Sequence, residues 1–360
     1  MRKIQVCLFF FIAISFMNSQ GFAQQVIQEE ITAQATLLYQ SFSKTQQYTG
    51  LLAFGDTSRL KWNNLPVGLR ARAGTSIANM NNDQRRILHR VLIASLSSQG
   101  YLKAGAIMHL DELLNQYYDS LYAQKKISDT NFRRIKDLKW SPGNYYFAFF
   151  GNPSQKPWGF KLEGHHLSIN FSFIGDNLAV TPLFLGTDPA EYTLSHYAGW
   201  RVLGKEEDLG LKLIRSLPPS QQKTAIMSGD VPRDIITSAE SGKRLIDYWG
   251  IKVSAMHPEH KELVQRILRE YVFNLEHEKA SMEYEKIMKA GLDNIYFGWI
   301  GKMEEKQPHY FVLNGPTFLI EFDNNGGPRN EANHIHTIWR EKGNEYGEDM
   351  LKSHYQKGNH

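Results

Sequence analysis

The sequence predicts an α+β fold made of two diverged tandem units, each with helices followed by an antiparallel meander sheet. Two observations predict it. The apolar pattern changes from helical spacing to strand-like alternation, and it does so twice along the chain. In addition, segments of the second half repeat segments of the first in the same order, as Asn144–Gly151 and Asn294–Gly301 do.

The first 23 residues have the pattern of an export signal. A basic start, Met1–Lys3, precedes an apolar run over 4–17 and the small-x-small sequence Gly21–Ala23. We expect cleavage after Ala23 and export to the periplasm or out of the cell. The apolar run is shorter than the roughly 20 residues that cross a bilayer, and no later stretch approaches that length, so we expect no transmembrane segment.

Removal of this signal restricts the available chemistry. The single cysteine, Cys7, lies within it, so disulfides, thiolate nucleophiles and cysteine metal ligands are excluded from the mature chain. The chain has 41 Lys and Arg and 37 Asp and Glu. Loss of Arg2 and Lys3 leaves 39 basic against the same 37 acidic residues. That balance gives no electrostatic argument for nucleic acid as a partner.

The N-terminal region, 24–79, combines a helix with irregular structure. Apolar residues at three-to-four spacing predict the helix over 26–47. The segment that follows lacks a regular period and is expected to be loop and short extended structure.

The first helix-plus-sheet unit is expected over 80–228. Helical spacing occurs in four segments, 82–97, 107–122, 206–217 and 220–227. Alternating segments predict strands over 145–150, 158–173 and 178–185.

The second unit is expected over 229–360. Its helix, from about 259 to 288, has the strongest pattern of the chain. Alternation then predicts strands over 295–300, 310–313, 318–323 and 334–339. Laying 157–171 on 308–322 aligns Phe160 with Phe311 and Leu162 with Leu313. Such duplications often place a site where the two copies meet, so we look for one there.

Three long blocks resemble a known bacterial family. They cover 150–173, 181–189 and 315–355, and they are similar to the family catalogued as domain of unknown function 3500. The resemblance extends over most of the mature chain. It implies no established activity, fold or catalytic residues, so the chemistry has to come from the residues themselves.

Histidines on predicted strands are the candidate metal ligands. His334 and His336 are two residues apart, so both imidazoles project from the same face of their strand. His165 and His166 are adjacent, so on a regular strand only one of them faces a given site. We favour His166, which shares its parity with Ser168 and Asn170, and expect His165 to be packed and hydrogen-bonded. A register shift of one residue would exchange the two.

Further residues complete the predicted centre. Glu321 is the candidate fourth ligand or general base, with Asp323 or Asn170 orienting the ligands, and Arg340 is the candidate anchor for an anionic substrate. His354, in the last predicted helix, is a possible further ligand. Three imidazoles with an optional carboxylate suit a divalent zinc, copper or iron ion. The alternative is that these histidines are satisfied core or edge residues.

The functional expectation is an exported metal-dependent enzyme acting on a small-molecule or polymeric substrate. A bound hydroxide at neutral pH would support hydrolysis, whereas a redox-active ion would support oxygen chemistry. The sequence does not choose between the two, and hydrolysis is slightly preferred. The alternative is a non-catalytic extracellular or periplasmic protein that captures a ligand in an aromatic and histidine-rich cleft. A structural metal, or none, in an interaction surface is a third reading.

Overall fold

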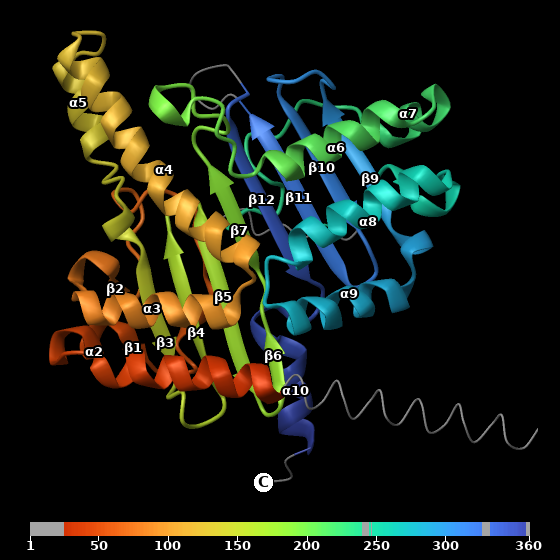
Figure 1. The fold of residues 1–360 in the computed structure, drawn as a ribbon. Coiled ribbons are helices and arrows are strands. Elements are labelled where there is room, and N and C mark those ends of the chain that lie inside the picture. The colour runs from red at the N-terminus through yellow and green to blue at the C-terminus, as the bar shows by residue number, and fades with distance from the viewer. Residues whose placement is uncertain (1–24, 240–244, 246, 326–331, 358–360) are drawn as a thin grey trace, which may run out of the picture.

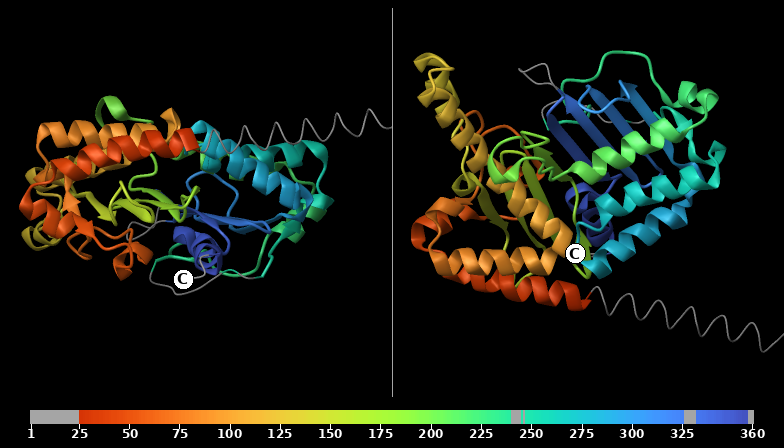
Figure 2. Two further views of the ribbon diagram at one scale, coloured as in Figure 1. Left: turned by 90° about the horizontal axis from the view of Figure 1, so that it is seen from below. Right: turned by 45° about the horizontal axis from the view of Figure 1, so that its top comes forward.

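The computed structural model describes residues 25–239, 245, 247–325 and 332–357. They form a two-layer α+β structure in which most helices cover one face of a large sheet (Figure 1). The view from below in Figure 2 shows the other face covered by irregular segments and by α10 (Glu348–Lys357). The α+β prediction is confirmed. The expected cleavage site after Ala23 lies outside the described residues.

The described strands form one 12-stranded mixed sheet instead of two separate antiparallel sheets. Their order is β1-β3-β4-β5-β7-β12-β11-β10-β9-β8, with β2 paired to β3 and β6 to β5. The sheet is mixed because β1 runs parallel to β3. The strands of the first half are β1 (Leu51–Leu52), β2 (Thr75–Ser76), β3 (Tyr146–Phe150), β4 (Trp158–Gly164), β5 (Leu167–Ile174), β6 (Asn177–Ala179) and β7 (Leu183–Thr187). Those of the second half are β8 (Ile251–Lys252), β9 (Tyr296–Gly301), β10 (His309–Asn314), β11 (Phe318–Asn325) and β12 (His334–Glu341).

From the centre outward, the order β7-β5-β4-β3 on one side corresponds to β12-β11-β10-β9 on the other. The outermost strands differ, because β1 is parallel to β3 whereas β8 is antiparallel to β9. β7 and β12 pair antiparallel at the centre, with Leu183 opposite Trp339. The β3–β4 pairing sets Phe147 opposite Leu162, and the β9–β10 pairing sets Phe297 opposite Leu313. Each half therefore contributes a meander, and the two meanders meet edge to edge at β7 and β12.

The helices of the described chain begin with one over residues 25–41. The others are α2 (Lys44–Gly50), α3 (Asn82–Ser95), α4 (Ser98–Ala123), α5 (Asp129–Lys136), α6 (Gly204–Ser216), α7 (Pro219–Ala225), α8 (Pro258–Val272), α9 (His277–Gly291) and α10. Single 3-10 turns occur at Thr57–Leu60, Ile77–Asn79, Pro142–Asn144, Ser195–Tyr197, Val253–Ala255, Leu292–Asn294 and Glu345–Gly347. Among these residues, no helix is both long and apolar enough to span a membrane.

The helix predicted over 259–288 is two helices, which corrects the sequence-based expectation. The break lies at 273–276, where Glu276 caps α9 by accepting hydrogen bonds from the backbone of residues 278 and 279. Leu275 also bridges Leu96, which lies in the break between α3 and α4. Tertiary pairing of the two breaks therefore overrides the continuous helical pattern, which no local breaker interrupts.

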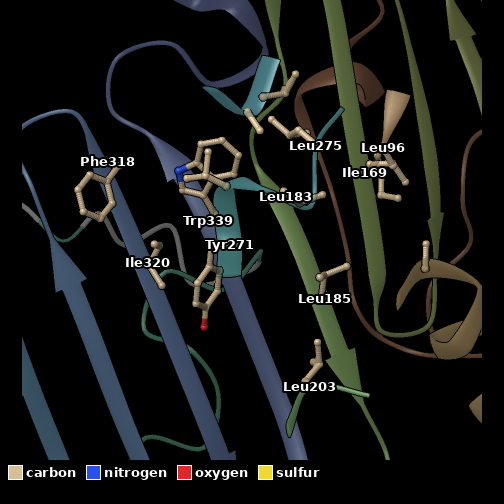
Figure 3. Close-up of a cluster of buried hydrophobic side chains, with 14 of the residues drawn as sticks. Leu96, Ile169, Leu183, Leu185, Leu203, Tyr271, Leu275, Phe318, Ile320 and Trp339 are labelled. Atoms are coloured by element: carbon tan, nitrogen blue, oxygen red, sulfur yellow. The ribbon is translucent and has the colours of Figure 1, made fainter. Parts of the chain in front are cut away.

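The main core lies between the helices and the sheet and is continuous across the two halves. Figure 3 shows Tyr271 and Trp339 of the second half beside Leu183 and Leu185 of the first, and Leu275 of the second half near Leu96 of the first. Trp339 is 1 % exposed. Burial of each such side chain contributes about 1.5–3 kcal/mol, so the junction between the halves is stabilised by their shared apolar contacts.

The opposite face of the sheet carries buried polar side chains at alternate strand positions. These are Lys161, Glu163, Ser168, Asn170, Ser172, Glu321, Asp323, His336 and Arg340. The segment 54–72 packs over part of this face. Lys161 Nζ donates to the carbonyl of Ser58 at 2.8 Å, and Oε1 of Glu163 accepts a hydrogen bond from the backbone N–H of Asn63 at 3.0 Å. Polar side chains of the sheet thus hold an irregular cover in place.

Candidate metal centre

The histidines meet at the junction of the two halves of the sheet. His336 lies on β12 opposite Gly186 of β7. His165 and His166 form the two-residue turn between β4 and β5, where Gly164 pairs with Leu167. The expectation of one continuous strand over 158–173 is therefore wrong, and strand parity does not apply to these two histidines. His166 adopts a left-handed φ of 61°, and its carbonyl accepts the Gly186 N–H at 2.7 Å.

Three imidazole nitrogens converge at this junction. Nε2 of His166 lies 2.8 Å from Nε2 of His334, which lies 3.0 Å from Nε2 of His336. Ligand atoms of the three side chains all lie within 4.8 Å of one another. Imidazole ligands bind zinc at about 2.0–2.1 Å, so nitrogens at these separations fit around one ion after small ring movements.

Asp234 orients one of these histidines. Its Oδ1 lies 2.8 Å from Nδ1 of His336, and Nδ2 of Asn64 lies 3.5 Å from the same nitrogen. A carboxylate at Nδ1 holds the ring proton there and leaves the Nε2 lone pair for the group of three nitrogens. Asp234 belongs to an irregular segment, so no periodicity in the sequence could have singled it out.

His165 joins a separate buried network. Its Nδ1 lies 2.6 Å from Oδ1 of Asp111 on α4, and Tyr145 donates to Oδ2 of Asp111 at 3.1 Å. The ring of His165 stacks on that of His166 with centroids 3.7 Å apart. The structure thus places His165 as a packed, hydrogen-bonded neighbour of His166, outside the group of three nitrogens.

The surroundings set the charge of the cluster. Burial lowers the pKa of His166 well below its usual value, and the positive charge of His165, His334 or His336 lowers it further. For His336, burial favours the neutral form, but Asp234 and two more distant carboxylates outweigh it, so its pKa is raised. His166 is therefore neutral near pH 7, the form that binds a metal ion.

Glu321 is not brought to the histidines. It lies opposite Ile338 in the β11–β12 register, whereas Asp323 lies opposite His336. Its carboxylate accepts hydrogen bonds from the backbone N–H of Ile236 at 2.7 Å and from the hydroxyl of Tyr310 at 2.9 Å. Strand parity correctly placed Glu321 on the same face of the sheet as His336. In the register, however, Glu321 lies two residues from Asp323, the residue opposite His336, and its oxygens bind other groups.

Arg340 and His354 also lie apart from the cluster. Arg340 is four residues beyond His336 on β12, roughly 13 Å along the strand. Its guanidinium donates to the carbonyl of Thr237 and to Glu345, each at 2.5 Å. The backbone of His354 lies in α10, and its side chain is outside the described part of the structure. Of the seven predicted site residues, the structure groups His166, His334 and His336.

Two histidines that have no other candidate ligand near them in the sequence are also buried. His309 is 0 % and His260 4 % exposed. His309 stacks on Trp299 with centroids 4.9 Å apart, and His260 Nε2 lies 3.0 Å from the carbonyl of Ser216. His309 lies on β10 under the helices and His260 lies on helix α8 itself, and both serve packing.

Gly186 provides the space in which two of the rings meet. A Cβ at this position would lie 3.0 Å from Cδ2 of His166, 3.1 Å from Cδ2 of His336 and 2.9 Å from the carbonyl oxygen of Ile335. We expect Gly186→Ala to displace both rings and to weaken metal binding by about tenfold or more, the scale on which disturbed ligand orientation acts. Competition with a chelating dye measures the affinity.

Gly105→Ala is the matched control, because a Cβ there meets no atom within 4 Å. It should leave metal affinity unchanged and slightly favour helix α4. Equal metal affinity in Gly186→Ala and the wild type would contradict the role given to Gly186.

The fold and the site define a class of protein: an α+β protein with a mixed 12-stranded sheet and a candidate three-histidine metal centre at its middle. The chain belongs to the family described as "Protein of unknown function (DUF3500)", whose profile matches residues 24–348. This confirms the family resemblance. Neither the curated proteins nor the solved structures include a match to this chain.

Proposed function

We propose that this is a metal-binding protein in which His166, His334 and His336 hold one divalent transition-metal ion, with zinc preferred, and that the centre supports hydrolysis. The observation that carries the proposal is the convergence of the three Nε2 atoms, with neighbouring separations of 2.8 and 3.0 Å. Three neutral imidazoles with a further open position are a ligand set used by catalytic zinc sites.

The surrounding residues support this assignment of ligands. Asp234 keeps the proton of His336 on Nδ1, so that Nε2 points its lone pair at the other two rings. The stacked ring of His165, itself held by Asp111, limits rotation of His166. An ion bound by three imidazoles supplies a Lewis acid and lowers the pKa of a bound water toward neutrality.

Solvent reaches the cluster from one side. His166 is 4 % and His336 8 % exposed, whereas His334 is half-buried. The side of His334 is therefore where an open ligand position and a substrate would lie. We assign hydrolysis on this ground and on the preference of zinc for such chemistry.

Elemental analysis of the mature chain tests the proposal. The protein has to be purified without a histidine tag and measured before and after reconstitution with zinc. We expect close to one zinc per chain, retained through gel filtration. No retained metal after reconstitution with zinc, copper or iron would refute the assignment and return the three histidines to a structural role.

A cavity favours a second candidate function, the capture of a ligand without catalysis. It has a volume of about 490 Å³ and is lined by Trp62, Arg72, Lys161 and Arg340 among others. Arg340 lies under the Trp62 ring, 5.8 Å from its centroid. An aromatic ring beside cations suits small acids or sugars. If a panel of such compounds raises the melting temperature of the metal-free protein and Trp62→Ala abolishes the shift, this function is favoured.

We also propose that the two halves arose by tandem duplication, with units near 80–228 and 229–360. The corresponding order of the four inner strands on each side and the equal β3–β4 and β9–β10 registers support this origin. The His166 ligand then comes from one copy and the His334 and His336 ligands from the other.

Export is proposed on the sequence pattern of residues 1–23. The family match begins at residue 24, directly after the expected cleavage position, which supports a separate role for the first 23 residues. Mass spectrometry of the chain recovered outside the cytoplasm should give an N-terminus at Gln24. A retained Met1 would exclude cleavage after Ala23.

A further inference from the structure

His336 faces two different groups of potential ligands. Its Nε2 lies 3.0 Å from Nε2 of His334, while its Nδ1 lies 2.8 Å from Oδ1 of Asp234. Asp323 lies directly opposite His336 in the β11–β12 register. Ligand atoms of Asp234, Asp323 and His336 all lie within 4.8 Å of one another. The ring of His336 thus separates a nitrogen-rich group from a carboxylate-rich one.

Asp323 is poorly satisfied for a buried carboxylate. Its side chain is 0 % exposed. Oδ1 accepts a hydrogen bond from Asn325 at 2.9 Å, whereas Oδ2 has no hydrogen-bond partner among the described residues. Burial of a carboxylate is costly unless hydrogen bonds or a cation compensate it. An oxygen that is buried beside a second carboxylate and a ring nitrogen, and accepts no hydrogen bond, indicates a position for a cation.

Asp234 gives this position access to solvent. Its side chain is 35 % exposed, in contrast to the 10 % of His336. An ion can therefore arrive at the Asp234 side without passing between the three histidine rings. Two carboxylates with one imidazole also differ from the three-imidazole group in the ions they prefer, because carboxylate oxygens suit manganese and magnesium better than imidazoles do.

We propose that Asp234, Asp323 and Nδ1 of His336 bind a second divalent cation, of the class that accepts mixed oxygen and nitrogen ligands, with Mn²⁺ as its representative. The inference rests on the proposed function in one respect, since His336 is a ligand in both groups. When both positions are filled, the Nδ1 proton of His336 leaves to solvent and each ring nitrogen binds one ion. The centre then holds two ions that share one imidazole.

Titration of the full mature chain with Mn²⁺, after loading with one equivalent of zinc, tests this inference. The loss of the free Mn²⁺ signal in electron paramagnetic resonance measures binding. We expect one Mn²⁺ per zinc-loaded chain. Asp323→Asn should weaken Mn²⁺ binding by about tenfold or more while zinc stays near one per chain. If Asp323→Asn does not fold, Asp234→Asn provides the test, with Mn²⁺ binding compared at matched zinc loading because Asp234 also orients His336 in the zinc group.

Asp230→Asn is the control, because Asp230 is an exposed acidic residue of the same segment. It should titrate like the wild type. The inference is overturned if the zinc-loaded wild type binds no Mn²⁺, or if both cluster variants titrate as Asp230→Asn does. Failure of the proposed function gives a different result, because the chain then takes up no zinc. In that case, Mn²⁺ titration of the metal-free chain and of its Asp variants tests the second cation site independently of the first.

Discussion

Alanine at both His334 and His336 is expected to abolish stoichiometric metal binding. The double variant removes two of the three converging Nε2 atoms and leaves His166 as a single imidazole. The loss in affinity should exceed the roughly 10–100-fold that removal of an outer partner costs, because direct ligands are lost. Elemental analysis and chelator competition on the wild type and the double variant measure it.

The fold should survive this change. Strand β12 keeps its backbone pairing with β7 and β11, and its core residues Ile335 and Trp339 are untouched. The matched control is His257→Ala with His277→Ala, since both of these histidines are exposed. In the metal-free state, the wild type, the His334 and His336 double variant and the control should have similar circular dichroism spectra and similar unfolding midpoints. Unchanged metal content in the His334 and His336 double variant would rule out the ligand assignment.

Replacement of Lys103 by methionine is expected to cause the largest loss of stability. Lys103 Nζ lies 2.8 Å from Oε1 of Glu206 and 2.7 Å from Oε1 of Glu270, and the side chain of Glu206 is 0 % exposed. The three residues tie α4 to α6 and α8. Methionine leaves a buried carboxylate without its cation, which costs about 3–5 kcal/mol. Urea unfolding followed by tryptophan fluorescence measures the change.

The deficit of Lys103→Met should shrink as the pH falls. Burial raises the pKa of Glu206, although Lys103 lowers it in the wild type. Without Lys103 the folded-state pKa rises further above the unfolded value, near 4.5. Below the folded-state pKa, Glu206 is protonated and its burial in the variant costs little. The variant loses stability as the pH rises through that folded-state pKa and the buried carboxylate becomes charged. Unfolding at pH 5 and pH 8 tests the sign.

Lys212→Met on α6 is the control, because Lys212 is exposed. Its effect should stay within about 0.5 kcal/mol at either pH. If Lys103→Met loses no more than this control, or if its deficit is the same at pH 5 and pH 8, the buried ion network does not stabilise the packing of these helices.

The three sequence-predicted ligands differ in how far the sequence alone could place them. His334 and His336 are two residues apart on a strand with clear alternation, so a period of two put both rings on one face. His166 lies 168 positions from His334 along the chain. His166 comes close to His334 only because β7 pairs with β12 and because His166 lies in the turn between β4 and β5. Strand parity favoured His166 on the assumption of a regular strand, and that assumption does not hold in a turn.

The carboxylates of the site show the limit of periodicity. Alternation assigned Glu321 and Asp323 to the correct face of β11, but the register decides which of them faces His336. Asp234 and Asp111, which bind His336 and His165, lie on an irregular segment and on a helix, where nothing local relates them to the histidines. The break between α8 and α9 likewise depends on a bridge to Leu96.

The sequence by itself determined the α+β class, the positions of most strands, the family and the pairing of His334 with His336. These follow from periodicity and from residue types, which act over a few residues. The tertiary structure alone decided that the two halves form one sheet, that His166 joins the β12 histidines and that Asp234 replaces Glu321 beside them. Contacts between residues far apart in sequence form only when the edges β7 and β12 pair, and no local pattern encodes that register.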